Sequence, residues 1–166
     1  RARMIFCSGE ETEKLYPASI TKLYAALVAL MYLEPETVVT AGEELKHMQP
    51  GSSRAYISRG CQLTVEMLVE AMLLPSGNDA SYVVAAAAGR AIAGEPTLDA
   101  DAAVTAFVEE MNRKSKEFGL ENSHFMNPDG YHHQEHYMCP KDAALVAALA
   151  LQQPVIAKYC ALQQDS

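Results

Sequence analysis

The chain has 166 residues, of which 49% are hydrophobic and 20% are charged, and its formal net charge is −8 at pH 7. This length fits one domain, and the balance of apolar and charged residues is typical of a globular protein rather than a disordered one. The acidic balance, without any cluster of lysine and arginine, argues against nucleic acid as a partner.

Apolar segments and cysteines exclude further classes of protein. The longest apolar segment, residues 23–33, is about half as long as the ~20 residues that cross a bilayer. The first residues, 1–4, lack a following apolar core and cleavage site, so we recognise no signal peptide and the chain fits a mature or trimmed product. No two cysteines form a Cys-x-x-Cys pair, so we expect buried free thiols rather than a zinc or redox site. The cysteines are Cys7, Cys61, Cys139 and Cys160.

A short strand is predicted at residues 3–7, followed by a polar turn and a helix. Pro17 favours a helix start, and apolar residues then recur at helical spacing until Pro35 forbids continuation. Ser19 therefore lies in the first helical turn. Because a helix has 3.6 residues per turn, Lys22 lies on the same face and its amine can reach the Ser19 hydroxyl. This Ser-x-x-Lys arrangement is typical of acyl enzymes that react with penicillin.

Glycines, prolines and serines interrupt residues 38–63, so this segment is predicted to be a loop with short extended pieces. Thr64 is the expected N-cap of a helix at residues 65–74. Turn-forming residues 75–79 interrupt that helix, and an alanine-rich helix is expected at about residues 80–90. Alanine side chains allow such a helix to approach its neighbours closely.

A long amphipathic helix is predicted next. Asp99 or Asp101 is its expected N-cap, and it ends at Phe118, because Gly119 suits the position after the last helical residue. Phe107 belongs to the apolar stripe of this helix, so we interpret it as a core residue.

Residues 120–137 show no regular pattern, and loops of this length in compact domains are often functional. Residues 132–136 read His-His-Gln-Glu-His. Their order is not His-Glu-x-x-His and the segment does not read as a helix, so we interpret it as a polar loop at the rim of a cleft rather than a metal site. A helix at residues 140–150 follows, and Pro154 opens a last short helix.

The triplet Ser76-Gly77-Asn78 lies between two predicted helices, where a loop can bring polar groups to the mouth of a cleft. For acyl transfer by a Ser-Lys pair, a second hydroxyl can carry a proton between the lysine and the leaving group. The amide of Asn78 can orient both Lys22 and a substrate carbonyl.

Four motifs in chain order, together with Asp142, resemble the serine D-alanyl-D-alanine carboxypeptidases, which are low-molecular-weight penicillin-binding proteins. The motifs are PASITK at 17–22, LLPSGNDA at 73–80, FVEEMN at 107–112 and FMNPDG at 125–130. The resemblance implies an α+β fold of the β-lactamase/DD-peptidase type. It also implies a periplasmic, cell-surface or secreted enzyme that removes the terminal D-Ala from peptidoglycan pentapeptides through a serine ester, without a cofactor, and that β-lactams acylate.

Residue by residue, the resemblance assigns Ser19 as the nucleophile and Lys22 as its activating base. Ser76 and Asn78 match the second motif of the family, for proton transfer and substrate binding. The backbone N–H of Ser19, at a helix N-terminus, would be one donor to the oxyanion.

The family has a third motif, Lys-Thr-Gly, on a strand that binds the substrate carboxylate, and these 166 residues contain none. We therefore expect residues 1–166 to form a single, incomplete, predominantly helical domain that lacks most of the sheet. Apolar surface left uncovered would favour a homodimer. A clean monomer at all concentrations in size-exclusion chromatography would count against that dimer.

Two alternatives remain open. A class A β-lactamase adds a Glu-x-x-Leu-Asn segment, but the residue four before Asn112 is Val108, so a β-lactamase-like hydrolase lacks its deacylating base here. The other alternative is a non-catalytic helical module of the same fold that serves binding or assembly.

Overall fold

The computed structural model describes residues 19–165, so the strand predicted at residues 3–7 lies outside the described part of the chain. This part is mainly helical, as expected. In chain order its elements are α1 (Ser19–Ala29), β1 (Val38–Thr40), the 3-10 helix η2 (Glu43–His47), β2 (Gln62–Thr64), α2 (Val65–Leu73), α3 (Asn78–Ala93), α4 (Ala100–Phe118), β3 (Ser123–His124), β4 (Tyr137–Met138), α5 (Pro140–Ala150) and α6 (Pro154–Asp165).

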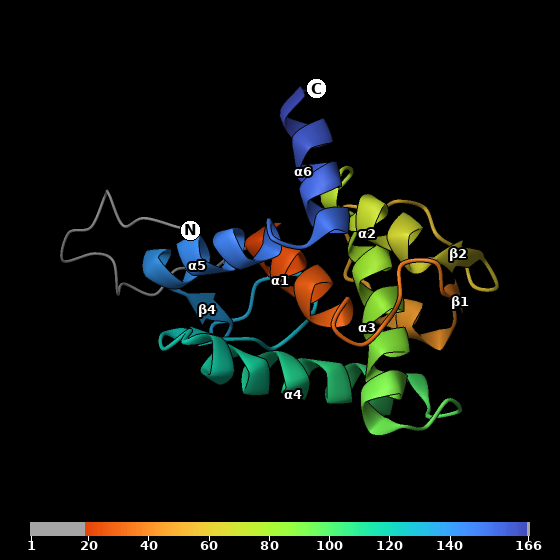
Figure 1. The fold of residues 1–166 in the computed structure, drawn as a ribbon. Coiled ribbons are helices and arrows are strands. Elements are labelled where there is room, and N and C mark those ends of the chain that lie inside the picture. The colour runs from red at the N-terminus through yellow and green to blue at the C-terminus, as the bar shows by residue number, and fades with distance from the viewer. Residues whose placement is uncertain (1–18, 166) are drawn as a thin grey trace.

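Helix α1 lies at the centre of the described residues and contacts α2, α3, α4, α5 and α6 (Figure 1). Tyr24 is fully buried and donates a hydrogen bond of 2.8 Å to the carbonyl of Met111 on α4. Its ring also stacks on Phe125, with ring centroids 4.7 Å apart. The helix that was predicted to stop before Pro35 is therefore confirmed, and it is the central buried helix.

Helices α3 and α4 pack closely, because small side chains line α3. A Cβ atom added to Gly89 would lie 1.8 Å from the carbonyl oxygen of Ala103 on α4. No real Cβ contact is that short, so the position accepts only glycine while the helices keep this spacing. Phe107 of α4 is fully buried, which confirms its place in the core.

The predicted helix ends are largely confirmed. The Thr64 side chain accepts a hydrogen bond from a first-turn N–H of α2, and Asp99, not Asp101, does the same for α4. Gly119 ends α4 in the left-handed conformation, with φ at 84°. Helix α3 begins at Asn78, two residues earlier than predicted, because its first turn includes the end of the turn segment.

The short extended pieces pair into two antiparallel two-stranded sheets, β1 with β2 and β3 with β4. Two features were not anticipated: the 3-10 helix η2 and the length of α6. Of the described cysteines, which are free, Cys139 is buried and caps α5, whereas Cys61 is exposed. The expectation of buried thiols is wrong for Cys61.

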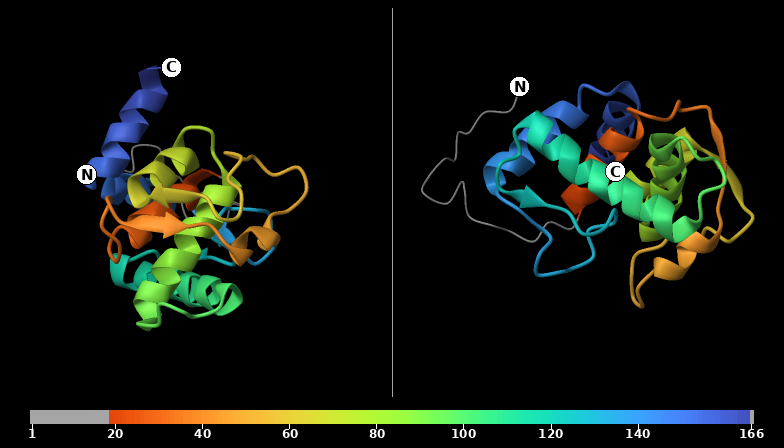
Figure 2. Two further views of the ribbon diagram at one scale, coloured as in Figure 1. Left: turned by 90° about the vertical axis from the view of Figure 1, so that its right-hand side faces the viewer. Right: turned by 90° about the horizontal axis from the view of Figure 1, so that it is seen from below.

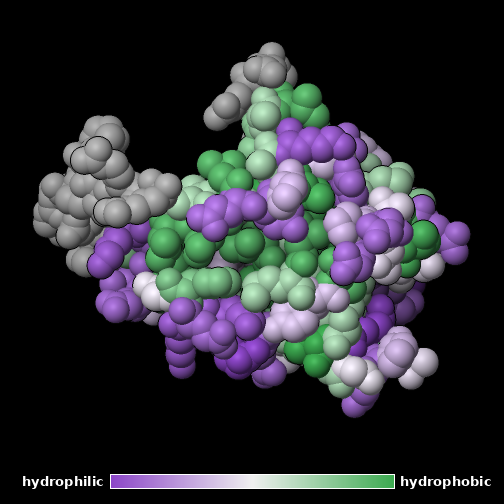
Figure 3. Space-filling model, in the orientation of Figure 1, coloured by the Kyte–Doolittle hydropathy of each residue, from purple (hydrophilic) through white to green (hydrophobic). Residues whose placement is uncertain are grey.

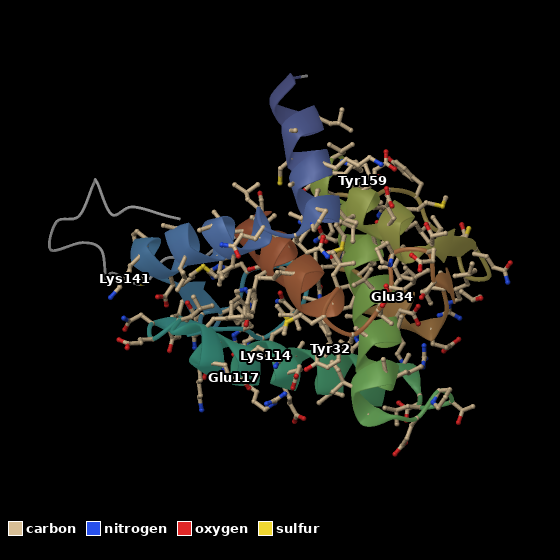
Figure 4. All side chains as sticks on the ribbon, viewed as in Figure 1. Tyr32, Glu34, Lys114, Glu117, Lys141 and Tyr159 are labelled. Carbon is tan, nitrogen blue, oxygen red and sulfur yellow. The ribbon has the colours of Figure 1, made fainter. Side chains whose placement is uncertain are left out.

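Apolar side chains gather over α1, α5 and the lower part of α6 on the face shown in Figure 3. Leu151, at the end of α5, is 54% exposed. Tyr159, labelled in Figure 4, joins α6 to α2 by donating a hydrogen bond of 2.8 Å to Glu66. No single helix in residues 19–165 is long and apolar enough to cross a membrane, although α5 and α6, bent by 106° at their junction, meet that test as a pair. The homodimer stays a prediction.

Candidate active site

Ser19 is the first residue of α1, and its side chain is exposed. The first N–H groups of a helix have no partner inside the helix and carry partial positive charge. A negative charge that develops on a group bound beside Ser19 is therefore stabilised by this end of α1. The sequence predicted this placement.

Lys22 lies one turn further along α1 and is only 6% exposed. Burial lowers the pKa of the Lys22 amine, because the charged form loses its hydration, and the negative charge of Asp129 partly opposes this shift. A lysine with a lowered pKa is neutral for a larger fraction of the time at neutral pH. It is therefore better able to accept a proton than a lysine in water.

Ser76 lies in the turn between α2 and α3 and has a positive φ of 59°. A non-glycine residue in this conformation costs on the order of 1–3 kcal/mol, which the surroundings must offset. The next residue supplies part of that support, since the Gly77 N–H donates a hydrogen bond of 2.8 Å to the carbonyl of Ala71. The turn is thus held with the Ser76 side chain half-buried.

Ser19 and Ser76 line the same pocket, which has a volume of about 170 Å³. Its remaining walls are mostly apolar and come from α1, α2 and α6, through Ile20, Leu23, Met72, Leu73 and Cys160. Two hydroxyl groups from distant parts of the sequence therefore face one small cavity at the N-terminus of α1.

Asn78, the first residue of α3, is buried and donates a hydrogen bond of 3.0 Å from Nδ2 to a carboxylate oxygen of Asp129. The other oxygen of Asp129 accepts the Tyr131 N–H at 3.2 Å. Burial raises the pKa of Asp129, whereas the Tyr131 N–H and the charge of Lys22 oppose that rise. Because a carboxylate only accepts, the Asn78 amide must turn its NH₂ toward Asp129, which leaves its carbonyl oxygen for other partners.

A second buried contact reaches α1 from the loop at residues 125–136. His136 is 2% exposed, and its Nδ1 accepts the Met126 N–H at 2.9 Å. In a neutral imidazole the other nitrogen must then carry the proton, so Nε2 donates to the Thr21 hydroxyl at 2.8 Å. Thr21 lies between Ser19 and Lys22, so this bond fixes the first turn of α1 against the loop.

The comparison with known proteins fits this geometry. The family model for peptidase S11, D-alanyl-D-alanine carboxypeptidase, matches residues 2–166. The chain belongs to the D-alanyl-D-alanine carboxypeptidase family. It is 31% identical over 166 residues to D-alanyl-D-alanine carboxypeptidase DacF of Bacillus subtilis, covering 97% of this chain and 39% of that protein.

A second relative and a solved structure support the same family membership. The chain is 30% identical over 142 residues to DacA of Haemophilus influenzae, covering 82% of the chain and 33% of that protein. The DD-transpeptidase of Streptomyces K15 superposes with a TM-score of 0.78 at 26% identity, over 92% of this chain and 57% of that one. The DD-peptidase fold is therefore confirmed, and the chain spans between a third and two fifths of the curated relatives just named.

Within this family member, the four residues proposed from sequence fall into two pairs. Ser19 and Ser76 share the pocket, while Lys22 and Asn78 are both coupled to Asp129. No hydrogen bond among the described residues joins Ser19, Lys22 and Ser76 to one another.

Three residues of the site were missed from sequence: Thr21, Asp129 and His136. Asp129 entered the sequence analysis as part of the FMNPDG motif without a role of its own, and no pattern in the sequence links that motif to a lysine on a distant helix. His136 was included in a polar loop at a cleft rim, which is wrong for this residue because it is buried.

The remaining histidines of this loop differ from His136, since His132 and His133 are exposed. Among residues 19–165, no three His, Cys, Asp or Glu side chains lie close enough together to hold a metal ion. Both ring nitrogens of His136 are already hydrogen-bonded to protein groups. His136 therefore joins the loop to α1, whereas the exposed His133 accepts the Glu135 N–H at 3.0 Å within the loop itself.

Proposed function

We propose that the protein carrying this chain is a serine-type D-alanyl-D-alanine carboxypeptidase, a hydrolase that acts on peptidoglycan stem peptides ending in D-Ala-D-Ala and that β-lactams acylate. Ser19 is the nucleophile, Lys22 is its base, Ser76 relays the proton and Asn78 positions the substrate. No cofactor or metal takes part. Family membership supports this reaction class.

One observation carries the assignment of residues. The pocket at the N-terminus of α1 holds the hydroxyl groups of Ser19 and Ser76, and the buried Lys22, with its lowered pKa, lies one turn behind Ser19. A serine hydroxyl is a weak nucleophile unless a base removes its proton, and a desolvated lysine is such a base.

In the proposed reaction, Ser19 Oγ forms a bond to the carbonyl carbon of the penultimate D-Ala while its proton passes to Lys22. The carbonyl oxygen becomes negatively charged beside the N-terminus of α1, where the Ser19 N–H can donate to it. When the C–N bond breaks, Ser76 passes the proton from Lys22 to the amine of the leaving D-Ala. Water then cleaves the serine ester and releases the shortened peptide.

This substrate places the enzyme outside the cytoplasm, at the periplasm or the cell surface, where peptidoglycan lies. The helical binding or assembly module and the β-lactamase-like hydrolase are the competing proposals. They differ from the carboxypeptidase in one measurable property, the formation and lifetime of a penicilloyl ester on Ser19.

The test uses the full-length gene product that contains these residues, incubated with benzylpenicillin and measured by intact mass. We expect an increase equal to one penicillin in the natural protein and none in Ser19→Ala, because the ester needs the hydroxyl. Ser58→Ala, a change at an exposed serine outside the pocket, is the matched control and keeps the adduct.

Each other outcome selects an alternative. If the natural protein forms no adduct at any β-lactam concentration, the carboxypeptidase assignment is wrong and the non-catalytic module replaces it. An adduct that forms and disappears within seconds would instead support a β-lactamase. An adduct that persists in Ser19→Ala would move the nucleophile to another residue.

A further inference from the structure

The loop between η2 and β2 forms an arch at residues 53–57, and three hydrogen bonds tie it to the start of α3. The Asn78 N–H donates to the carbonyl of Ser53 at 2.8 Å. The buried carboxylate of Asp79 accepts the N–H groups of Ala55 and Ile57, each at 2.9 Å. The arch is therefore held by the same two residues that begin the helix behind Ser76.

The arch also contacts the Ser76-Gly77-Asn78 turn directly. A Cβ atom added to Gly77 would lie 3.0 Å from the Cβ of Ala55 and 2.8 Å from Oδ1 of Asp79. A side chain at residue 77 would thus push the arch away. Glycine at this position lets the arch lie against the turn that carries Ser76.

Tyr56 lies at the centre of the arch, between the two N–H groups that Asp79 holds. Its φ is 62°, and it is 86% exposed. Glycine or asparagine would adopt this conformation at lower cost than tyrosine. A bulky aromatic side chain that is both strained and exposed contributes little to the stability of the fold, and its ring is free to contact a ligand.

The charge of the loop differs from that of the whole chain. Residues 50–61 contain Arg54 and Arg59 but no acidic residue, although the chain has a formal net charge of −8. Arg59 is paired with Glu43 at 2.7 Å. Arg54 is exposed and makes no ion pair with another described residue, so its charge is available to a ligand.

We propose that the arch is a specificity surface for an acidic peptide substrate. The Tyr56 ring packs on the part of the peptide that precedes its D-Ala-D-Ala end, and the Arg54 guanidinium pairs with a carboxylate of that part. The inference rests on the proposed function. Both views of Figure 2 show the loop at residues 48–61 extending from the helical body, where a ligand can reach it.

The test compares three peptides ending in D-Ala-D-Ala with the full-length gene product. The first has five residues and a free carboxylate before the lysine, the second carries an amide in place of that carboxylate, and the third is only an acylated Lys-D-Ala-D-Ala. We expect Tyr56→Ala to lower kcat/KM for both long peptides about tenfold, with the short peptide changed less than about twofold.

Arg54→Gln is expected to lower kcat/KM about tenfold for the peptide with the free carboxylate and to leave the amidated peptide unchanged. Arg59→Gln is the matched control in the same loop, because Arg59 already has a partner, and it changes none of the ratios. Tyr56→Gly relieves the positive φ, so it combines an unchanged or higher melting temperature with the same loss on the long peptides.

Penicillin acylation separates the two hypotheses. All these variants are expected to keep the acylation rate of the natural protein, since penicillin lacks the peptide segment that the arch is proposed to bind. If the natural protein forms the adduct but the arch variants keep its ratio of long to short peptide turnover, the arch proposal is overturned while the carboxypeptidase stands. If the natural protein forms no adduct and cleaves none of the peptides, both proposals fall.

Discussion

The helices and the two long loops of this structure are stabilised by different kinds of interaction. The contact between α3 and α4 depends on apolar packing so close that no side chain fits at Gly89. The loops at residues 48–61 and 125–136 are instead tied to the helices by buried polar side chains. The helices therefore bring together the segments that carry Ser19 and Ser76, whereas a small number of polar groups determines how the loops meet the helices.

Three side chains make such contacts with the two loops, and a fourth makes them with the residues just before the second loop. Asp79 holds the arch, and His136 joins the second loop to α1. Asn112 exchanges two hydrogen bonds with the backbone of Phe125, at 2.8 and 2.9 Å. Asp142 accepts a backbone N–H and a hydroxyl from residues 122 and 123. Each gives a hydrogen-bond partner to polar groups that are removed partly or fully from water where these segments meet the helices.

Gly89→Ala tests the helical side of this comparison and has the largest expected effect on stability. The new methyl group would meet the backbone oxygen of Ala103, which cannot rotate away as a flexible side chain does. We expect the free energy of unfolding to fall by about 3 kcal/mol, measured by urea denaturation of the full-length protein.

Gly94→Ala is the matched control on the same helix. Gly94 ends α3 with φ at 68°, and no atom lies within 4 Å of an added Cβ. The Gly94→Ala variant therefore loses only the preference of glycine for a positive φ, and its free energy of unfolding should fall by about 1 kcal/mol. Equal effects of the two substitutions would show that steric contact between α3 and α4 is not what limits residue 89.

His136→Ala tests the loop side and is expected to cost about 2 kcal/mol, because the Met126 N–H and the Thr21 hydroxyl lose a buried partner. His136→Gln keeps an amide that can donate to Thr21, so it costs less. The difference between these two variants, from urea denaturation at pH 7, measures the contribution of the hydrogen bonds rather than of volume alone.

The same residue makes stability depend on pH. Burial, with smaller contributions from His124, His133 and His132, lowers the pKa of His136 to about 4. In the unfolded chain this histidine binds a proton below about pH 6.5, whereas in the folded chain it stays neutral until about pH 4. The free energy of unfolding therefore keeps its full value above about pH 6.5 and decreases as the pH falls toward 4. Between pH 7 and pH 5 the natural protein should lose about 2 kcal/mol more than His136→Gln. Parallel pH curves for the two proteins would contradict the buried neutral imidazole.

Local patterns were sufficient to predict the helices. Thr64 and Asp99 are favoured N-caps, Gly119 is a favoured C-cap, and apolar residues at helical spacing marked the buried faces between them. These features depend on residues close together in the sequence, which is why their predicted bounds differ from the structure by only a few residues.

The details of the site could not be predicted in the same way. Ser19, Lys22, Ser76 and Asn78 were recognisable because their motifs combine chemistry with fixed spacing. The partners of Thr21 and Asn78 lie 115 and 51 residues away in the sequence, on a loop without periodicity. Contacts of that kind depend on how the helices pack, and no local pattern encodes them.

Variants of Asp129 test how a charge on the second loop changes the pKa of a lysine on α1. Its negative charge raises the pKa of Lys22 against the opposing effect of burial. Asp129→Asn removes the charge but keeps an oxygen that can accept from Asn78, whereas Asp129→Ala removes both. Asp129→Asn should lose some stability, because its NH₂ replaces the oxygen that accepts the Tyr131 N–H, and Asp129→Ala should lose more, because it also leaves the Asn78 amide without its acceptor.

Under the mechanism proposed above, the acid limb of the pH profile for penicillin acylation reports the protonation of Lys22 in the protein before penicillin binds. Without the charge of Asp129, the pKa of Lys22 falls further, so in Asp129→Asn this limb moves to lower pH while the plateau rate is kept. In Asp129→Ala the limb moves in the same direction, but the plateau also falls because the Asn78 amide is no longer oriented. An acid limb that stays in place in both variants would mean that Asp129 orients Asn78 without tuning Lys22, and that another group sets the pH dependence of acylation.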